Sequence, residues 1–277
     1  MTTYSITELW RYPVKSMGGE RVESLELRTS AVVGDRQWAV RNSETGKIAS
    51  AKRPRPYGQL LSWSARTQAD GGLVVVSPDG RVYAVGSEEL DAALTEALGE
   101  PVQVVEVEKG REETYGSEWP EIPGTVLSDV EVDLPIAAIT EKTSFVDASA
   151  VHIIVNQSMK HLASLLDGVE LGVERFRPNI VLDAHDDVGS GEFADLAWKD
   201  IDFKIGNAEL RIGDATPRCV MTTLAQPGYE QAKSVLQVLA ATARKEFDYG
   251  AFACFGTNAE VTAAGTIKVG DTFTVTD

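Results

Sequence analysis

Short apolar runs separated by turn residues constrain the fold of this chain more than any other feature of its sequence. In the first hundred residues, strands are expected over Ile6–Tyr12, Val22–Leu27, Gln37–Arg41, Leu60–Arg66, Leu73–Ser77 and Val82–Val85. Between them stand the turn pairs Gly18-Gly19, Gly34-Asp35, Gly71-Gly72 and Asp79-Gly80. Such runs, bounded by glycine and aspartate, are typical of strands joined by tight turns. The first hundred residues are therefore predicted to be rich in β-structure.

Only a few segments carry a helical period. Leu90, Leu94 and Leu98 predict an amphipathic helix over Glu88–Leu98 that ends at Gly99. In the second half, helices are expected over Gln157–Leu166 and Gln231–Arg244, and strands over Val151–Val155, Asn179–Asp183, Asp202–Ile205, Ala208–Ile212, Val220–Leu224, Glu260–Thr262 and Thr272–Thr276. Strands and helices do not alternate strictly. The pattern favours a mainly β, α+β fold with an antiparallel barrel over a doubly wound parallel sheet.

A segment without any sustained period divides the chain. Residues 108–128 mix charged residues with three glycines and two prolines, which is typical of a linker or a long loop. The expected organisation is a β-rich domain over residues 1–107, this linker, and a second domain over residues 129–277. At 277 residues, two ordinary domains are as reasonable as one large domain.

The charge of the chain limits its partners. With 26 basic and 42 acidic side chains, the formal net charge is −16, which argues against a protein that coats nucleic acid. The charge is uneven, because residues 1–55 have a balance of +4, so an anion site is expected to draw on this part. Two cysteines are too few for a disulfide scaffold or an iron–sulfur cluster. With no signal peptide and no long apolar run, a cytoplasmic protein without a membrane partner is expected.

Common catalytic motifs are missing from the sequence. It contains no Gly-x-Gly-x-x-Gly after a strand, no P-loop, no Gly-x-Ser-x-Gly and no His-Glu-x-x-His. The usual support for dinucleotide, nucleoside triphosphate and common hydrolase sites is therefore lacking. The three histidines, His152, His161 and His185, are scattered, and structural or surface roles are expected for each.

One informative segment contains a cysteine directly after an arginine. Cys219 follows Arg218 on a turn shaped by Pro217, so a neighbouring cation would favour its thiolate. A buried cysteine that acts as a small hydrophobic residue is the alternative. Cys254, which lies between aromatic residues, fits that alternative better.

Two more segments carry groups that can bind an anion. Pro178 biases Arg177 toward an extended conformation, which would place Arg177 and Asn179 at the mouth of the following strand, although a surface loop is equally compatible. On glycine-rich turns near the N-terminus, Lys15, Ser16 and Arg36 supply ammonium, hydroxyl and guanidinium donors that together could hold a phosphate.

Together these segments resemble the MOSC family, the molybdenum-cofactor sulfurase C-terminal domain with its N-terminal β-barrel companion. The similar words are "YPVKS", "GDRQW", "SAKRPR", "RFRPNIV", "PRCVMTT" and "GTIKVGDTF", in this order along nearly the whole chain. The two-domain members, which include the mitochondrial amidoxime-reducing component, carry them at corresponding places. The resemblance implies a MOSC-type β-barrel, an N-terminal β-rich domain and a cofactor cleft between them.

The resemblance implies a molybdenum cofactor, molybdopterin with its metal, and assigns roles around it. Cys219 would be the protein ligand of molybdenum, and Arg218 would flank the metal. Lys15, Ser16 and Arg36 would hold the pterin phosphate. A soft thiolate suits high-valent molybdenum with sulfur and oxo ligands.

Four further residues correspond to cofactor-binding positions of the family. Arg177 and Asn179 would face the pterin, and Asp147 and Ser149 stand near a family Asp-Thr-Ser word. Planar groups with many donors suit a pterin, which is itself planar with many donors and acceptors.

Reduction of N-hydroxylated, amidoxime-like small molecules is the activity that the resemblance implies. Electrons would come from a separate donor protein of the flavin, cytochrome or ferredoxin type, because the chain has no ferredoxin-like extension after "GDTFTVTD" and few cysteines. The alternative is a carrier of the cofactor, or a protein that handles its sulfur, without turnover of its own. A third possibility, a barrel that has lost the cofactor and binds another small anion, is disfavoured because the thiol and the phosphate residues both persist.

Overall fold

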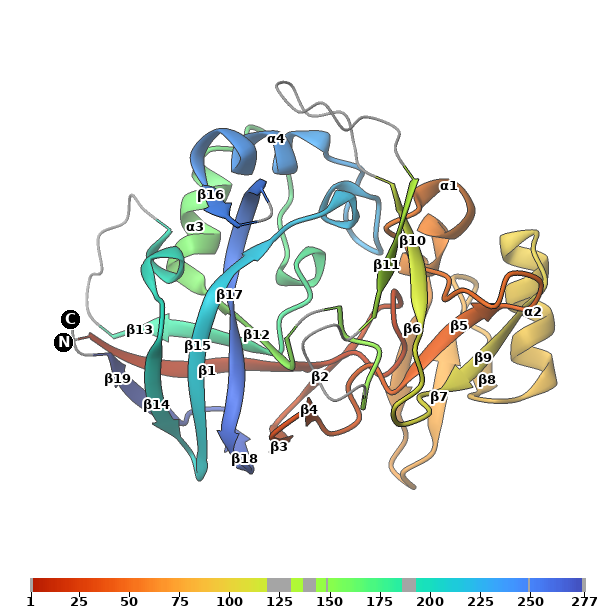
Figure 1. The fold of residues 1–277 in the computed structure, drawn as a ribbon, viewed down its shortest axis with the longest axis horizontal. Helices are drawn as coiled ribbons and strands as arrows, with labels where there is room; N and C mark the ends of the chain where they lie inside the picture. The colour runs from red at the N-terminus through yellow and green to blue at the C-terminus, as the bar shows by residue number, and fades with distance from the viewer. Residues whose placement is uncertain are drawn as a thin grey trace.

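The largest sheet contains nine strands (Figure 1). The computed structural model describes residues 2–118, 131–136, 143–147, 149–185, 193–248 and 250–275. The strands follow the order β14 (Ile201–Ile205), β15 (Ala208–Pro217), β17 (Gly250–Ala263), β12 (Val151–Val155), β13 (Ile180–Ala184), β1 (Thr2–Arg11) and β19 (Thr272–Val275), with β16 (Arg244–Phe247) on β17 and β2 (Glu20–Val22) on β1. All pairs are antiparallel except β12 with β13. Among the described residues no pairing joins β14 to β19, so the sheet does not close into a barrel.

Burial along the strands shows which face each side chain occupies. In β15, Ala208, Leu210 and Ile212 are buried and the residues between them are exposed, which is the alternation of a strand with one wet face. All five residues of β12 are buried. This strand is covered on both faces because Ile153 packs in one core and Ile154 in another.

Two longer helices and three short 3-10 helices pack beside this sheet. The helices are α3 (Asn156–Ser164) and α4 (Lys233–Thr242), and the 3-10 helices are η2 (Val173–Arg175), η3 (Ala194–Ala197) and η4 (Val220–Thr223). Leu162 of α3 and Leu239 of α4 share a core with Phe176 and Phe255. No helix in the described part of the chain combines the length and apolarity needed to cross a membrane.

The remaining elements form smaller sheets. Two of them have two strands each, β5 (Trp38–Asn42) with β9 (Val102–Glu106) and β10 (Thr114–Glu118) with β11 (Glu131–Pro135). Two have three strands each, β6 (Ser64–Thr67) with β7 (Leu73–Val76) and β8 (Val82–Ala84), and β18 (Gly265–Lys268) with β3 (Ser24–Arg28) and β4 (Ala31–Val32). The helices of this part are α1 (Pro54–Tyr57), η1 (Gly58–Ser62) and α2 (Glu88–Leu98). Ser87 caps the start of α2, and Gly99 ends it with φ 72°, in the left-handed region. Figure 1 shows α2 with β5 to β9 at the opposite end of the molecule from β14 and β19.

The mainly β fold with few helices is confirmed, and α2 and β12 lie where the sequence predicts them. The strand predicted over Val220–Leu224 is wrong, because this segment forms η4. The strand predicted over Leu60–Arg66 is wrong in its first part, which belongs to η1. Glu260–Thr262 proves to be part of the 14-residue strand β17.

The sheets connect the two predicted domains closely. Strand β1 pairs with β13 and β19, and β3 pairs with β18, so the first strands of the chain complete sheets of its C-terminal half. Part of the expected linker, Thr114–Glu118, is the strand β10. Residues 119–128 of that linker lie outside the described residues, and the domain limits stay a prediction.

Candidate functional site

A cavity of about 730 Å³ brings together all nine residues that the sequence singles out. Its lining includes Lys15, Ser16, Arg36, Asp147, Ser149, Arg177, Asn179, Arg218 and Cys219. These residues are up to 204 positions apart in the sequence. The pairing of β1 with β13 brings the segment after β1 next to the segment before β13, and η4 follows β15 into the same region. Residues from both halves of the chain therefore form one cavity.

The lining is positively charged although the protein is acidic. Among the described residues it contains six cationic side chains, Lys15, Arg36, Lys52, Arg175, Arg177 and Arg218, against three carboxylates, Asp147, Asp214 and Glu260. The whole chain has a formal net charge of −16. Low-dielectric walls of one sign concentrate the field of these groups in the cavity. The site therefore suits an anion small enough to enter it.

Unusual backbone conformations coincide with the predicted site residues. Four non-glycine residues of the described chain have positive φ, and three of them are Ser16 (66°), Arg36 (47°) and Arg177 (56°). The extended conformation expected for Arg177 before Pro178 is therefore wrong, because its φ lies in the left-handed region. Such conformations cost about 1–3 kcal/mol each and persist only where the surrounding structure imposes them. Their concentration at one cavity is an independent sign that these side chains are held in place for a function.

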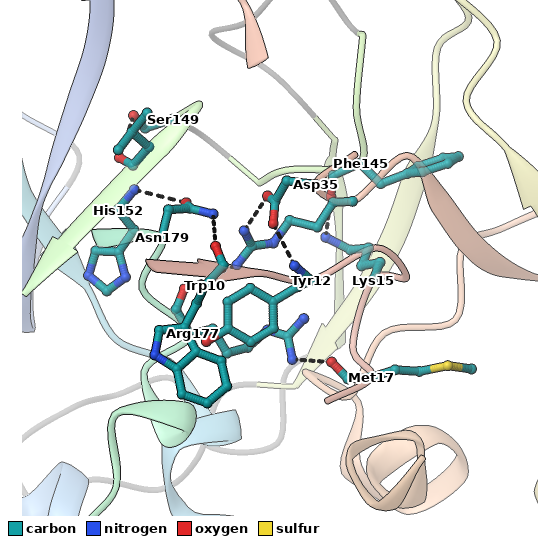
Figure 2. A network of polar contacts seen from close by, with 12 residues as sticks. Trp10, Tyr12, Lys15, Met17, Asp35, Phe145, Ser149, His152, Arg177 and Asn179 are labelled. Carbon is teal, nitrogen blue, oxygen red and sulfur yellow. Dashed lines mark hydrogen bonds and ion pairs between the residues drawn. The ribbon is translucent and has the colours of Figure 1, made fainter. Parts of the chain in front are cut away.

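Two arginines stack on one buried tyrosine at the cavity wall. The guanidinium carbons of Arg36 and Arg177 lie 4.8 and 4.3 Å from the centre of the Tyr12 ring. Arg36 Nη1 pairs with Asp35 Oδ2 at 2.5 Å, and Arg177 Nη1 donates to the Met17 carbonyl at 2.5 Å (Figure 2). Burial, and secondarily repulsion from Arg36, lowers the pKa of Arg177 to about 10. Arg177 Nη2 is buried and has no hydrogen-bond partner among the residues that the structure describes.

Two lysines share one carboxylate at another wall of the cavity. Lys15 Nζ lies 2.6 Å from Asp147 Oδ1 and Lys52 Nζ lies 3.0 Å from Asp147 Oδ2. Lys15 also donates to the Phe145 carbonyl at 2.9 Å (Figure 2), and Lys52 donates to Tyr115 Oη at 2.8 Å. Burial lowers the pKa of Lys15 to about 8, against the attraction of Asp147. Both lysines are charged at neutral pH.

The cysteine lies at the start of a short turn that the sequence itself stabilises. Cys219 is half-buried and precedes η4, and its carbonyl accepts from Thr222 Oγ1 at 3.0 Å. Thr223 Oγ1 donates to the Val220 carbonyl at 2.8 Å. These bonds back to the chain replace strand pairing, which is why the segment is not a strand. The turn exposes Cys219 to the cavity, whereas Cys254 is fully buried, with a thiol pKa raised to about 11 chiefly by burial.

Arg218 joins the cysteine turn to the segment around Phe176. Its Nη2 donates to the Phe176 carbonyl at 2.7 Å, and its Nη1 lies 3.4 Å from His152 Nε2. Burial lowers the pKa of Arg218 to about 10, and attraction to Cys219 works in the opposite direction. Burial and then Arg218 lower the pKa of His152 well below its usual value, so His152 is neutral. Arg218 Nε is also buried, and no residue in the described part of the chain accepts a hydrogen bond from it.

Asn179 and Ser149 line the cavity but bind backbone with their side chains. Asn179 Oδ1 accepts from the His152 N–H at 3.2 Å, and its Nδ2 donates to the Trp10 carbonyl at 3.3 Å (Figure 2). Ser149 Oγ donates to the Ala259 carbonyl at 2.9 Å. In this structure both residues hold strands together around the cavity, and their role as cofactor contacts stays a prediction.

Four residues of the site escaped the sequence analysis. Lys52 stands in the "SAKRPR" word, which marked its neighbourhood without assigning it a role. Arg175 likewise stands in the "RFRPNIV" word without an assigned role. Tyr115 carries no signal of its own, because its role comes from a long-range contact. His152 is buried, which agrees with the structural role expected for it, and it also lines the cavity.

The donors of the cavity fit the cofactor that the sequence suggests. Arg177 Nη2 and Arg218 Nε are buried donors for which the described residues provide no acceptor, and such groups cost free energy unless a ligand satisfies them. Cys219 supplies a soft sulfur ligand beside them. Cationic groups and a thiol at one cavity match an anionic pterin phosphate and a molybdenum ion.

Comparisons with known proteins found similar family models, sequences and solved structures. The model of the MOSC N-terminal beta barrel domain matches residues 3–113, and that of the MOSC domain matches residues 140–274. Human mitochondrial amidoxime-reducing component 1 is 26% identical over 296 residues, covering 96% of this chain and 81% of that protein. Molybdenum cofactor sulfurase from Oryza sativa subsp. japonica is 28% identical over 268 residues, covering 85% of this chain and 30% of that protein. The solved YUAD protein from Bacillus subtilis is 10% identical and covers 99% of this chain and 97% of its own, with a TM-score of 0.45.

The two family models lie in the order that the sequence words indicate, and together they span most of the chain. The chain belongs to the MOSC family and carries both the MOSC domain and its N-terminal beta barrel companion.

Proposed function

We propose that this protein binds the molybdenum cofactor in the cavity and reduces N-hydroxylated small molecules of the amidoxime type. The observation that carries this proposal is the convergence of nine predicted residues, including a thiol and four cations, on one positively charged cavity. When bound, the cofactor would supply two-electron redox chemistry. Two electrons and two protons convert an N-hydroxyl group into N–H and water.

The protein's part in this proposal is to hold and orient the cofactor. Cys219 offers its thiolate to the metal from a turn fixed by threonine hydroxyls. Arg177 and Arg218 present unused buried donors, and Lys15 and Arg36 supply positive charge for a phosphate. The close contact of Arg36 with Asp35 fixes the direction of its guanidinium group.

A separate protein is proposed to deliver the electrons, through a flavin, a cytochrome or a ferredoxin-type cluster. The two free cysteines of the described chain are Cys219 and Cys254, and Cys254 is fully buried. Cys219 is already the proposed ligand of the metal, and one buried cysteine cannot hold an iron–sulfur cluster, which needs about four cysteine ligands.

Metal and pterin analysis of purified protein tests the proposal. Protein made in a host that synthesises the cofactor is expected to contain about one molybdenum and one pterin per chain. With a chemical reductant it is expected to convert an amidoxime to an amidine. Protein without molybdenum or pterin would contradict both cofactor binding and catalysis.

A cofactor carrier, or a protein that handles the sulfur of the cofactor, is the second candidate. It is favoured by the similarity to molybdenum cofactor sulfurase, which covers 85% of this chain. The same assay separates the two candidates, because a loaded protein that reduces no N-oxygenated substrate, but passes the cofactor to an apoenzyme, would be a carrier.

A further inference from the structure

We propose that Asp147 is an internal counter-anion that a phosphate group of the ligand displaces from Lys15 and Lys52. Lys52, which neither the sequence words nor the family roles assign, thereby becomes the second lysine of the phosphate site. The inference rests on the proposed function for the identity of the natural ligand. Its chemistry, the exchange of a carboxylate for a phosphate, can be tested without that ligand.

The three groups form one compact ion cluster. The carboxylate oxygens of Asp147 lie 2.6 Å from Lys15 Nζ and 3.0 Å from Lys52 Nζ, one oxygen to each lysine. Both ammonium groups also lie near the Tyr115 ring, 5.0 and 4.7 Å from its centre. One carboxylate thus neutralises half of the charge of two closely spaced cations.

Exposure shows which member of the cluster can leave. The side chains of Lys15 and Lys52 are 7% and 15% exposed, whereas that of Asp147 is 40% exposed. All three line the cavity. The lysines are therefore fixed in the wall, and the carboxylate faces the open volume from which a ligand arrives.

A phosphate is a better partner for this wall than the carboxylate. Two partly buried ammonium groups without an anion would carry a large desolvation cost, which explains why Asp147 holds them before a ligand binds. A phosphate monoester has up to two negative charges and three terminal oxygens, so it can accept from both lysines and from a further donor. Arg36 and Ser16 line the same cavity. The released carboxylate is then free to accept hydrogen bonds from a pterin, which is the role the sequence analysis expects for it.

The chain contains a matched arrangement outside the cavity. Glu113 is shared by Arg41 at 2.5 Å and Arg111 at 3.0 Å. Its side chain is only 8% exposed, and it does not belong to the lining described for the cavity. This cluster therefore provides a control in which a carboxylate between two cations has no ligand to compete with.

Phosphate binding to cofactor-free protein tests the exchange. Full-length protein from a host that cannot make the cofactor is titrated with inorganic phosphate by calorimetry at pH 7. Asp147→Asn is expected to bind phosphate about tenfold more tightly than the wild type, because the competing carboxylate is gone. Lys52→Met and Lys15→Met are expected to weaken binding by about tenfold each, and Glu113→Gln is expected to leave it unchanged.

Three outcomes would overturn the inference. Asp147→Asn with unchanged or weaker phosphate binding would show that the carboxylate is no competitor, and unchanged binding by Lys52→Met would remove Lys52 from the site. If Asp147→Asn does not fold, a crystal structure of the wild type with phosphate decides, since a carboxylate still paired with both lysines contradicts exchange. Metal and pterin analysis is a separate measurement. If it contradicts the proposed function, the phosphate titrations still decide whether Asp147 competes with phosphate.

Discussion

Three residues of the cavity have strained backbone conformations. Ser16, Arg36 and Arg177 have positive φ values, and one buried nitrogen of Arg177 has no partner within the described ranges of the chain. A fold selected for stability alone has no reason to keep both features in one place. We infer that the cavity is preorganised, and that the binding free energy of a ligand offsets the strain and the unsatisfied donor of these residues.

Replacement of Cys219 tests whether this residue is a metal ligand or an ordinary thiol. Cys219→Ser is expected to fold normally, because the side chain is half-buried at a cavity wall, and to lose reductase activity to background. The absorption and electron paramagnetic resonance spectra of the loaded protein are expected to change. Cys254→Ala is the control, since that thiol is buried in the core and lies outside the cavity lining. Unchanged spectra and activity in Cys219→Ser would refute the ligand assignment.

Two segments of the site act as one element because arginines tie them together. Arg175 Nη1 donates to the carbonyls of Thr222 and Leu224 at 3.3 and 3.0 Å, and Arg218 donates to that of Phe176 at 2.7 Å. The words "RFRPN" and "RCVMTT" therefore describe two sides of one cross-linked unit. The position of the cysteine turn depends on a residue more than forty positions earlier in the chain.

Arg175→Met is expected to loosen the cysteine turn, while it leaves in place Lys15, Lys52 and Arg36, the cations proposed to hold a phosphate. Buried carbonyls would lose their donor, so the free energy of unfolding is expected to fall by about 3 kcal/mol. Hydrogen exchange at residues 220–224 is expected to accelerate, and retention of the metal to decrease. Arg28→Met, at a side chain that is 65% exposed, is the control. Equal exchange in both variants would show that Arg175 does not position the turn.

A buried carboxylate beside α3 makes stability depend on pH. Burial raises the pKa of Asp195 to about 6, and Ser158 Oγ donates to it. The folded state binds this proton more tightly than the unfolded chain, so the stabilisation is complete below pH of about 3.8 and is lost as the pH rises through about 6. Asp195→Asn keeps an acceptor for Ser158 and no charge.

From pH 5 to pH 8, urea unfolding is expected to show Asp195→Asn gaining about 1.4 kcal/mol relative to the wild type, because a pKa of about 6 leaves roughly one pH unit of the stabilisation to be lost above pH 5. Asp202→Asn, at a carboxylate that is 68% exposed, is expected to show no such trend. A pH-independent difference between Asp195→Asn and the wild type would contradict the raised pKa.

Local patterns predicted the elements whose shape is decided locally. The leucine spacing and Gly99 fix α2, and a run of apolar residues fixes β12. The segment Val220–Leu224 looks like a strand by composition, but threonine hydroxyls and Arg175 fold it into η4. The candidate site residues could be chosen from motifs. The sharing of Asp147 by Lys15 and Lys52 could not, because it depends on a contact between residues 132 positions apart.

At the scale of the whole molecule, charge is separated between surface and cavity. The chain carries −16 overall, while the described lining of the cavity has three more cationic than acidic side chains. An acidic exterior repels large polyanions, whose approach is governed by the long-range field. A small anion that enters the cavity meets the local positive field instead, where screening by salt is weak. The distribution of charge therefore selects the size of the anion as well as its sign.

Two double variants with the same net charge test this selection. Lys15→Met with Arg36→Met removes two cations from the cavity, and Lys199→Met with Arg211→Met removes two from the exposed surface. Both change the formal charge from −16 to −18, so any difference reports position and not total charge. The cavity variant is expected to retain at least tenfold less pterin after dialysis, about 1.4 kcal/mol or more in binding free energy, and the surface variant as much as the wild type. Pterin released from each protein is measured by fluorescence. Equal loss from both variants would mean that the overall field, and not the cavity, holds the cofactor.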